Sequence, residues 1–122
     1  MTQWKTLVWL DLYLSGSSRG DFAPPAPFVA GSLPEQPYSK EELQGYRLYC
    51  RRKCQTIFEA LTEEKANQLC KFPWGETVSF AELQLYNMRH VQEHASQLSL
   101  HLGQEAGSAL DYWVARAGDT AV

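Results

Sequence analysis

The sequence predicts an all-α protein in which residues 1–122 form a single domain. In three stretches apolar residues recur at three- and four-residue spacing, which is typical of helices. Capping motifs led by serine or threonine stand before the later stretches, and we find no alternation of apolar and polar residues typical of a strand. We therefore expect an incomplete up-down helix bundle with three main helices and a long loop rich in proline and glycine.

The first expected helix covers residues 3–14 and is followed by a loop over residues 15–38. The helix is apolar nearly all round, so we expect it to be largely buried. The loop holds five prolines, which sustain neither helix nor central strand. A loop this long in a compact domain is more often functional or packed over the core than a free linker.

The second expected helix covers residues 39–61, and a short helix over 62–70 follows it. Ser39 and Glu42 have the spacing of a capping box, and Thr62 is a candidate N-cap for the short helix. A core stripe is expected on the second helix at Leu43, Tyr46, Cys50, Cys54, Ile57 and Leu61.

The third main helix is expected over residues 79–102, and it carries all three histidines. Ser79 and Glu82 form a second capping-box pattern, and Gly103 is placed where a helix commonly ends. Residues 111–117 add one further helical turn in this interpretation.

Charge and cysteine content narrow the class of protein. A net charge of −3 gives no reason to expect nucleic acid as a partner, and no apolar run has the length of a membrane span. Cys50, Cys54 and Cys70 cannot all pair within one chain, which fits a reducing compartment, so we expect the cytoplasm. We interpret the three cysteines as small buried hydrophobic residues, and a role as nucleophiles or extra ligands ranks lower.

His90 and His94 are the clearest candidates for chemistry in this chain. Four residues apart on a helix, they have the spacing by which two histidines bind one metal ion. His101 lies on the same face but about 10 Å further along, too far to share the ion. At 100° per residue this histidine face lies at the edge of an apolar arc that runs from Phe80 to Met88. Two polar residues at a solvated edge remain the alternative interpretation.

The segment LQLYNMRHVQEHASQLSLHLGQ (83–104) resembles the last helix of DinB-like proteins, a bacterial superfamily of four-helix bundles. The resemblance rests on H-x-x-x-H after an N-x-R-H lead-in and before A-x-Q-L. It extends through FPWGETVSFAELQLYNMRH (72–90) and WLDLYLSG (9–16).

This resemblance implies a divalent metal, often nickel or zinc, bound by three histidines. Two of them correspond to His90 and His94, whereas the third position is occupied here by Lys5, whose protonated amine has no lone pair to offer. The family's first helix has no counterpart in this chain. We therefore expect a homodimer or higher oligomer that covers the apolar surface left open.

Two functions follow from these residues. The first is a metal site of the kind found in thiol-dependent transferases, lined by Lys5, Trp9, Trp74 and Tyr86 under the loop of residues 15–37, with Asp11, Tyr13 or Glu93 as replacement ligands. The second is a non-catalytic bundle in which Lys5 helps to bind a small anion or a partner. No catalytic residue is assigned in either case.

Overall fold

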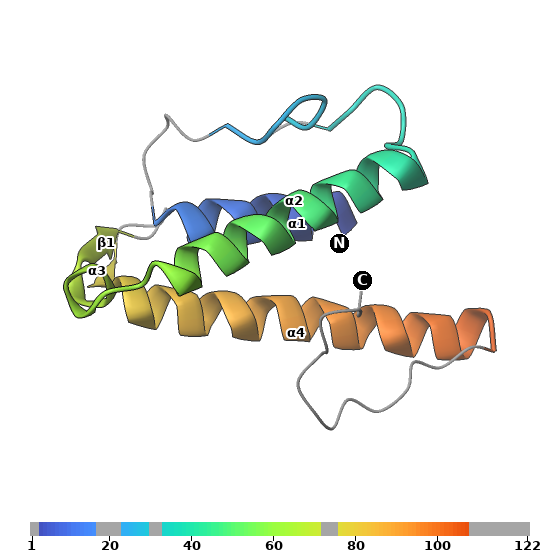
Figure 1. Ribbon diagram of the computed structural model, residues 1–122. Helices are drawn as coiled ribbons and strands as arrows, with labels where there is room; N and C mark the ends of the chain where they lie inside the picture. The colour runs from blue at the N-terminus through green and yellow to red at the C-terminus, as the bar shows by residue number, and fades with distance from the viewer. Residues whose placement is uncertain (1–2, 17–22, 30–32, 72–75, 108–122) are drawn as a thin grey trace.

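A computed structural model describes residues 3–16, 23–29, 33–71 and 76–107 of the chain. The helices are α1 (Gln3–Ser15), α2 (Lys40–Glu59), α3 (Glu63–Asn67) and α4 (Phe80–Glu105). The strands β1 (Leu69–Lys71) and β2 (Thr77–Ser79) form a small antiparallel ladder between α3 and α4. The described part of the chain is mostly helical, which confirms the all-α prediction in its coarse form (Figure 1).

Helix α1 packs against both α2 and α4 (Figure 1). It runs parallel to α2, because Leu7 lies beside Cys50 and Asp11 lies beside Lys53 further along both helices. It runs antiparallel to α4, whose Gln84 side chain donates to the carbonyl oxygen of Tyr13. Two neighbouring helices in the same direction depart from the alternating order of an up-down bundle. The connection between α1 and α2 is long enough for the chain to return to the level at which α1 starts before α2 begins.

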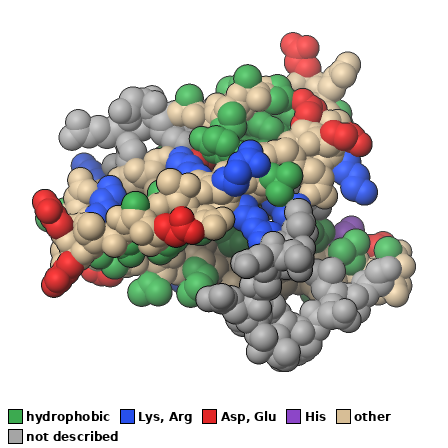
Figure 2. All heavy atoms as spheres, viewed as in Figure 1, with side chains coloured by type: hydrophobic (Ala, Val, Ile, Leu, Met, Phe, Trp, Pro, Cys, Tyr) green, Lys and Arg blue, Asp and Glu red, His purple; other side chains and the backbone are tan. Residues whose placement is uncertain are grey.

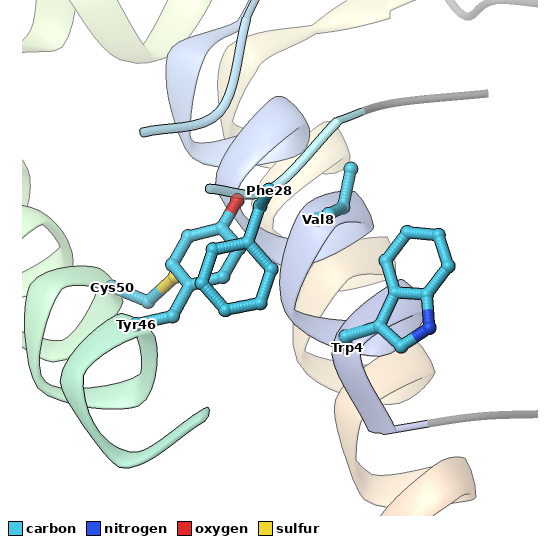
Figure 3. Close-up of a cluster of buried hydrophobic side chains, with 5 residues drawn as sticks. All are labelled: Trp4, Val8, Phe28, Tyr46 and Cys50. Atoms are coloured by element: carbon cyan, nitrogen blue, oxygen red, sulfur yellow. The ribbon is translucent and has the colours of Figure 1, made fainter. Parts of the chain in front are cut away.

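The first core cluster joins α1, α2 and the long loop, and it is drawn in Figure 3. It consists of Trp4, Val8, Phe28, Tyr46 and Cys50. Phe28 comes from the loop and is only 5% exposed, with its ring centroid 4.4 Å from the ring centroids of both Tyr38 and Tyr46. The loop therefore packs over the core at this point, as expected from its length.

The second core cluster closes the end of α1 against the start of α4. It consists of Tyr13, Cys70, Phe80 and Leu83. Gly16 ends α1 with φ of 65°, and a Cβ atom at this position would lie 3.0 Å from Cδ1 of Phe80. Glycine is required here both by the backbone conformation and by the close approach of the Phe80 ring.

The capping predictions for α2 and α3 are confirmed. The Ser39 hydroxyl accepts from the Glu42 backbone, and the Glu42 carboxylate accepts from the Ser39 backbone, which completes the capping box. The Thr62 hydroxyl caps α3 by accepting from the Lys65 backbone N–H. At α4 the Ser79 hydroxyl accepts from the Glu82 backbone N–H but donates to the Glu82 carboxylate. Only half of the second box therefore forms, and it still satisfies one N–H of the first turn.

The structure corrects two predicted boundaries. Helix α4 continues through Gly103 to Glu105, and Gly107, with φ of 67°, is the glycine that follows its end. The short helix expected over residues 62–70 ends at Asn67, because Leu69–Lys71 pairs with Thr77–Ser79 instead. Three-residue strands are too short to show an alternating pattern, so the sequence gives no signal for them.

Among the described residues, none of the helices has both the length and the apolar character needed to cross a membrane. Residues 111–117, for which a last helical turn was expected, lie outside the described part of the chain.

Candidate functional site

His90 and His94 face each other across one turn of α4. Their Nε2 atoms lie 3.2 Å apart, and both side chains are half-buried. His101 is exposed, in line with the prediction that it stands outside this pair. The i,i+4 spacing therefore brings together the two ring nitrogens that the sequence singled out.

The distance between these nitrogens has a direct meaning for metal binding. Two histidine ligands at about 2.0–2.1 Å from a tetrahedral zinc ion lie about 3.3 Å apart. The observed 3.2 Å is close to that value, and it is also a hydrogen-bond distance between the two rings. An ion held by two protein ligands keeps at least two further coordination positions for other groups.

Each ring nitrogen of His94 has a hydrogen-bond partner. Nδ1 of His94 lies 2.9 Å from Oε1 of Gln97, and when Nδ1 donates to this oxygen, Nε2 keeps its lone pair. Burial, together with the neighbouring His94, lowers the pKa of His90 below its usual value, although Glu93 acts in the opposite direction. These effects favour the neutral form of His90, the state in which imidazole binds metals.

Aromatic side chains of α1 and α4 form one wall of the site. The Tyr13 ring meets His90 edge to face at 6.0 Å, and the Tyr86 ring stacks on His90 at 6.4 Å between centroids. Trp9 stacks in turn on Tyr13 at 5.7 Å. Tyr86 thus contacts His90 directly and Trp9 reaches it only through Tyr13, whereas Trp74 lies outside the described residues.

Lys5 lies on the same stripe of α1 as Trp9 and Tyr13, at successive steps of four residues. The antiparallel contacts of α1 with α4, Tyr13 with Gln84 and Leu10 with Asn87, fix the relative height of the two helices. Continued along both axes, this register puts Lys5 level with the turn between His90 and His94. The Lys5 ammonium lies 5.8 Å from the centroid of the Trp4 ring.

The three side chains considered as replacement ligands are poorly suited to that role. Burial and the adjacent Tyr86 raise the pKa of Tyr13, so its hydroxyl stays protonated. Glu93 is exposed and lies 4.0 Å from Arg89, in line with its predicted solvent-facing position. Within the described ranges, no three His, Cys, Asp or Glu side chains come close enough together to hold a metal ion.

Asp11 is the third replacement candidate, and it belongs to a different site between α1 and α2. It is 1% exposed, and its carboxylate accepts from the Lys53 ammonium and, at 2.8 Å, from the Tyr46 hydroxyl. Lys53 also donates to Ser15 Oγ at 2.6 Å. Sequence reasoning missed this pair. The available signal was a carboxylate on a helix otherwise expected to be buried all round, which requires a partner.

All three cysteines are free thiols, as expected, with Cys50 and Cys70 buried and Cys54 half-buried. Burial and, next, the charge of Asp11 raise the pKa of Cys50 to about 12. Burial also raises the pKa of Cys54 and of Cys70. Since the thiolate is the reactive form, these residues are poor nucleophiles at neutral pH.

The cysteine environment predicts a loss of stability in alkali. The folded chain keeps the Cys50 proton up to about pH 12, whereas the unfolded chain releases it near about pH 8.5. The folded chain therefore holds this proton more tightly than the unfolded chain does. As pH rises above about 8.5, the free energy of unfolding falls. Urea titrations at pH 7, 8.5 and 10 measure this fall, and it should be smaller for Cys50→Val.

In the native state, thiol reagents at pH 8 should react slowly at all three positions. Rapid labelling of Cys50 in the folded chain would contradict the assignment.

A surface hollow lies beside α3 and is lined by Thr62, Glu64, Lys65, Asn67 and Gln68. It contains no histidine or cysteine, and it is separate from the histidine pair in the sequence and in the fold. We therefore take His90 and His94, and not this hollow, as the candidate site.

Comparison of the chain with models of known protein families, with curated proteins and with solved structures finds no match in any of the three.

Proposed function

We propose that this chain is a DinB-like helical protein that binds one divalent metal ion, nickel or zinc, through Nε2 of His90 and His94. The observation that carries the proposal is the 3.2 Å separation of these two atoms, the separation that a shared ion requires. Imidazole ligands suit both nickel and zinc. Gln97 supports the proposal, because its hydrogen bond to Nδ1 of His94 directs the lone pair of Nε2 toward the ion.

His90 and His94 would hold the ion and leave coordination positions open. The ion would supply Lewis-acid chemistry that lowers the pKa of a thiol or water, as in thiol-dependent transferases. The rings of Tyr13 and Tyr86 contact His90, and Trp9 stacks on Tyr13, so one side of the proposed site is aromatic. These aromatic surfaces favour a substrate with an apolar part.

The test is a titration of the purified, metal-free protein with Ni²⁺ and with Zn²⁺, followed by calorimetry. Wild-type protein should bind one ion per chain. His90→Ala and His94→Ala should each weaken binding by roughly 100-fold, because a single histidine ligand remains. His101→Ala is the matched control, since it removes an exposed histidine from the same helix and should leave the affinity unchanged. Equal affinity in all four proteins would refute a site at this pair.

The second candidate function is a non-catalytic bundle that binds a small anion near Lys5. The position of Lys5 along α1, level with the turn between His90 and His94, favours this second function. An ammonium group there would repel a cation and attract a carboxylate or phosphate. In the same calorimetric experiment, binding of inorganic phosphate that is lost in Lys5→Met, together with no uptake of either metal, would support this function over the first.

A further inference from the structure

A strip of polar side chains follows α4 from its buried contact with α1 to the histidine pair. We call it the α4 polar strip, and it consists of Gln84, Asn87, His90, His94 and Gln97. Residues three or four positions apart on a helix are neighbours on one face, so each member of the strip lies beside the next. Met88 was expected in the buried arc and is 56% exposed instead, because α1 packs against the side of α4 that holds Gln84 and Asn87.

Hydrogen bonds fix the orientation of the two buried amides at the start of the strip. The Gln84 amide nitrogen donates to the Tyr13 carbonyl oxygen at 2.7 Å, so the Gln84 amide oxygen is left to accept from Nδ2 of Asn87 at 3.2 Å. Nδ2 of Asn87 also donates to the Leu10 carbonyl oxygen at 3.4 Å. A flipped Asn87 amide would set its oxygen against these two acceptors. Oδ1 of Asn87 is therefore the atom on the opposite side of the amide.

The hydrogen bonds of the strip are interrupted at one place, between Asn87 and His90. Among the residues that the structure describes, two buried side-chain polar atoms have no hydrogen-bond partner, Oδ1 of Asn87 and Nδ1 of His90. Asn87 is only 2% exposed. In Figure 2 histidine surface is visible only as a small purple area toward the C-terminal end of α4. Buried polar atoms are nearly always paired, so two unpaired ones on neighbouring residues call for an explanation.

The hydrogen bonds of the histidine pair explain why these two atoms do not bind each other. When Nδ1 of His94 donates to Gln97, Nε2 of His94 accepts, and the proton between the two rings is on Nε2 of His90. Nδ1 of a neutral His90 then carries a lone pair. Oδ1 of Asn87, one turn earlier on the same face, is also an acceptor, and two acceptors form no hydrogen bond.

The role of Nδ1 changes when His90 serves as a metal ligand. A neutral histidine that gives its Nε2 lone pair to an ion has its proton on Nδ1, so this atom becomes a donor. Histidine ligands almost always donate this second N–H to a carboxylate, a carbonyl oxygen or water. Oδ1 of Asn87 is a carbonyl oxygen on the neighbouring turn, and it is the unpaired buried acceptor of this part of the fold.

We propose that Asn87 is a positioning residue of the metal site, whose Oδ1 accepts the Nδ1 proton of His90 when both histidines hold the ion. This inference rests on the proposed function and names the residue that orients His90 within it. Gln97 has the corresponding contact with Nδ1 of His94. Asn87 is itself held to α1 through the Leu10 carbonyl oxygen, so the docking of α1 on α4 fixes the orientation of His90.

Calorimetric titration of Asn87 variants with Zn²⁺ tests the proposal. Asn87→Leu removes the acceptor and should weaken zinc binding by roughly 10- to 100-fold. Asn87→Asp loses the same two donated hydrogen bonds but keeps an acceptor toward His90, so it should bind zinc at least as tightly as wild type. Gln84→Met is the matched control, because it removes a buried amide that contacts α1 but not the acceptor, and it should change the affinity far less than Asn87→Leu does.

The possible failures can be told apart. If Asn87→Leu binds zinc as tightly as wild type, or if all three variants weaken binding alike, Asn87 has at most a structural role and the inference is wrong while the metal site stands. No zinc binding by the wild-type protein would overturn the proposed function and this inference together.

Nitrogen-15 NMR of the zinc-loaded wild-type protein tests the same contact without a substitution. The Nδ1 proton of His90 should be shifted downfield and should exchange slowly with water, because a buried oxygen holds it. The exposed His101 is the internal reference for a ring proton in free exchange. A His90 ring proton that exchanges as fast as those of His101 would overturn the proposal.

Discussion

Replacing Lys53 with methionine is expected to destabilise the fold by about 3 kcal/mol, because it leaves a buried carboxylate without its counter-ion. Asp11 is 1% exposed and the Lys53 side chain is 22% exposed, so water cannot readily take the place of the ammonium group. The Ser15 hydroxyl loses a donor in the same step. Urea denaturation monitored by circular dichroism gives the difference in unfolding free energy.

Two further variants separate the ion pair from a general effect of charge on α2. Arg52→Met removes an exposed neighbouring cation and should change stability by less than about 0.5 kcal/mol. Adding Asp11→Asn to Lys53→Met should recover part of the loss, since the buried charge is then removed. If Lys53→Met were no more harmful than Arg52→Met, the pair would not hold α1 to α2 as described.

Replacing Lys5 with histidine is expected to raise the affinity for nickel and zinc by roughly 100-fold, because a third nitrogen ligand joins His90 and His94. The expectation follows from the register of α1 against α4, which puts position 5 level with the turn between the two histidines. Calorimetric titration gives the affinity. With Co²⁺ as a probe, the visible absorption band reports the added ligand.

Lys5→Met distinguishes a gained ligand from a lost repulsion. It removes the ammonium charge without supplying a nitrogen, so it should raise the affinity much less than Lys5→His does. Identical affinities in wild type and Lys5→His would mean that position 5 does not face the histidine pair. The correspondence between Lys5 and the third ligand position would then be wrong.

The helix starts were predictable from the sequence because a cap is a local interaction. The Ser39 and Glu42 box closes within four residues, so the sequence contains all of its parts. The end of α4 was not predictable in the same way. Gly103 and Gly107 are both placed to end a helix, and only Gly107 adopts the positive φ. A glycine inside a helix costs about 1 kcal/mol, a cost small enough for the further hydrogen bonds of one more turn to offset.

The candidate site was partly predictable for a related reason. The i,i+4 spacing of His90 and His94 fixes their proximity on any helix, whereas their orientation toward Tyr13 depends on how α1 docks. Asp11 and Lys53 lie 42 positions apart, and nothing local in the sequence pairs them. Met88 shows the same limit, since an apolar arc marks residues suited to burial without showing which neighbour covers them.

The central place of α1 has a consequence for the order of events during synthesis. Its contacts with α2 and α4 join residues between 35 and 77 positions apart in the chain. On the ribosome, α1 is therefore made before α2 and α4. Its apolar surface stays uncovered until both of these helices have been synthesised. Such long-range contacts slow folding, because the intervening chain must close before they form. A nascent chain that already contains α1 and α2 but not yet α4 thus still exposes the side of α1 that α4 covers in the complete fold.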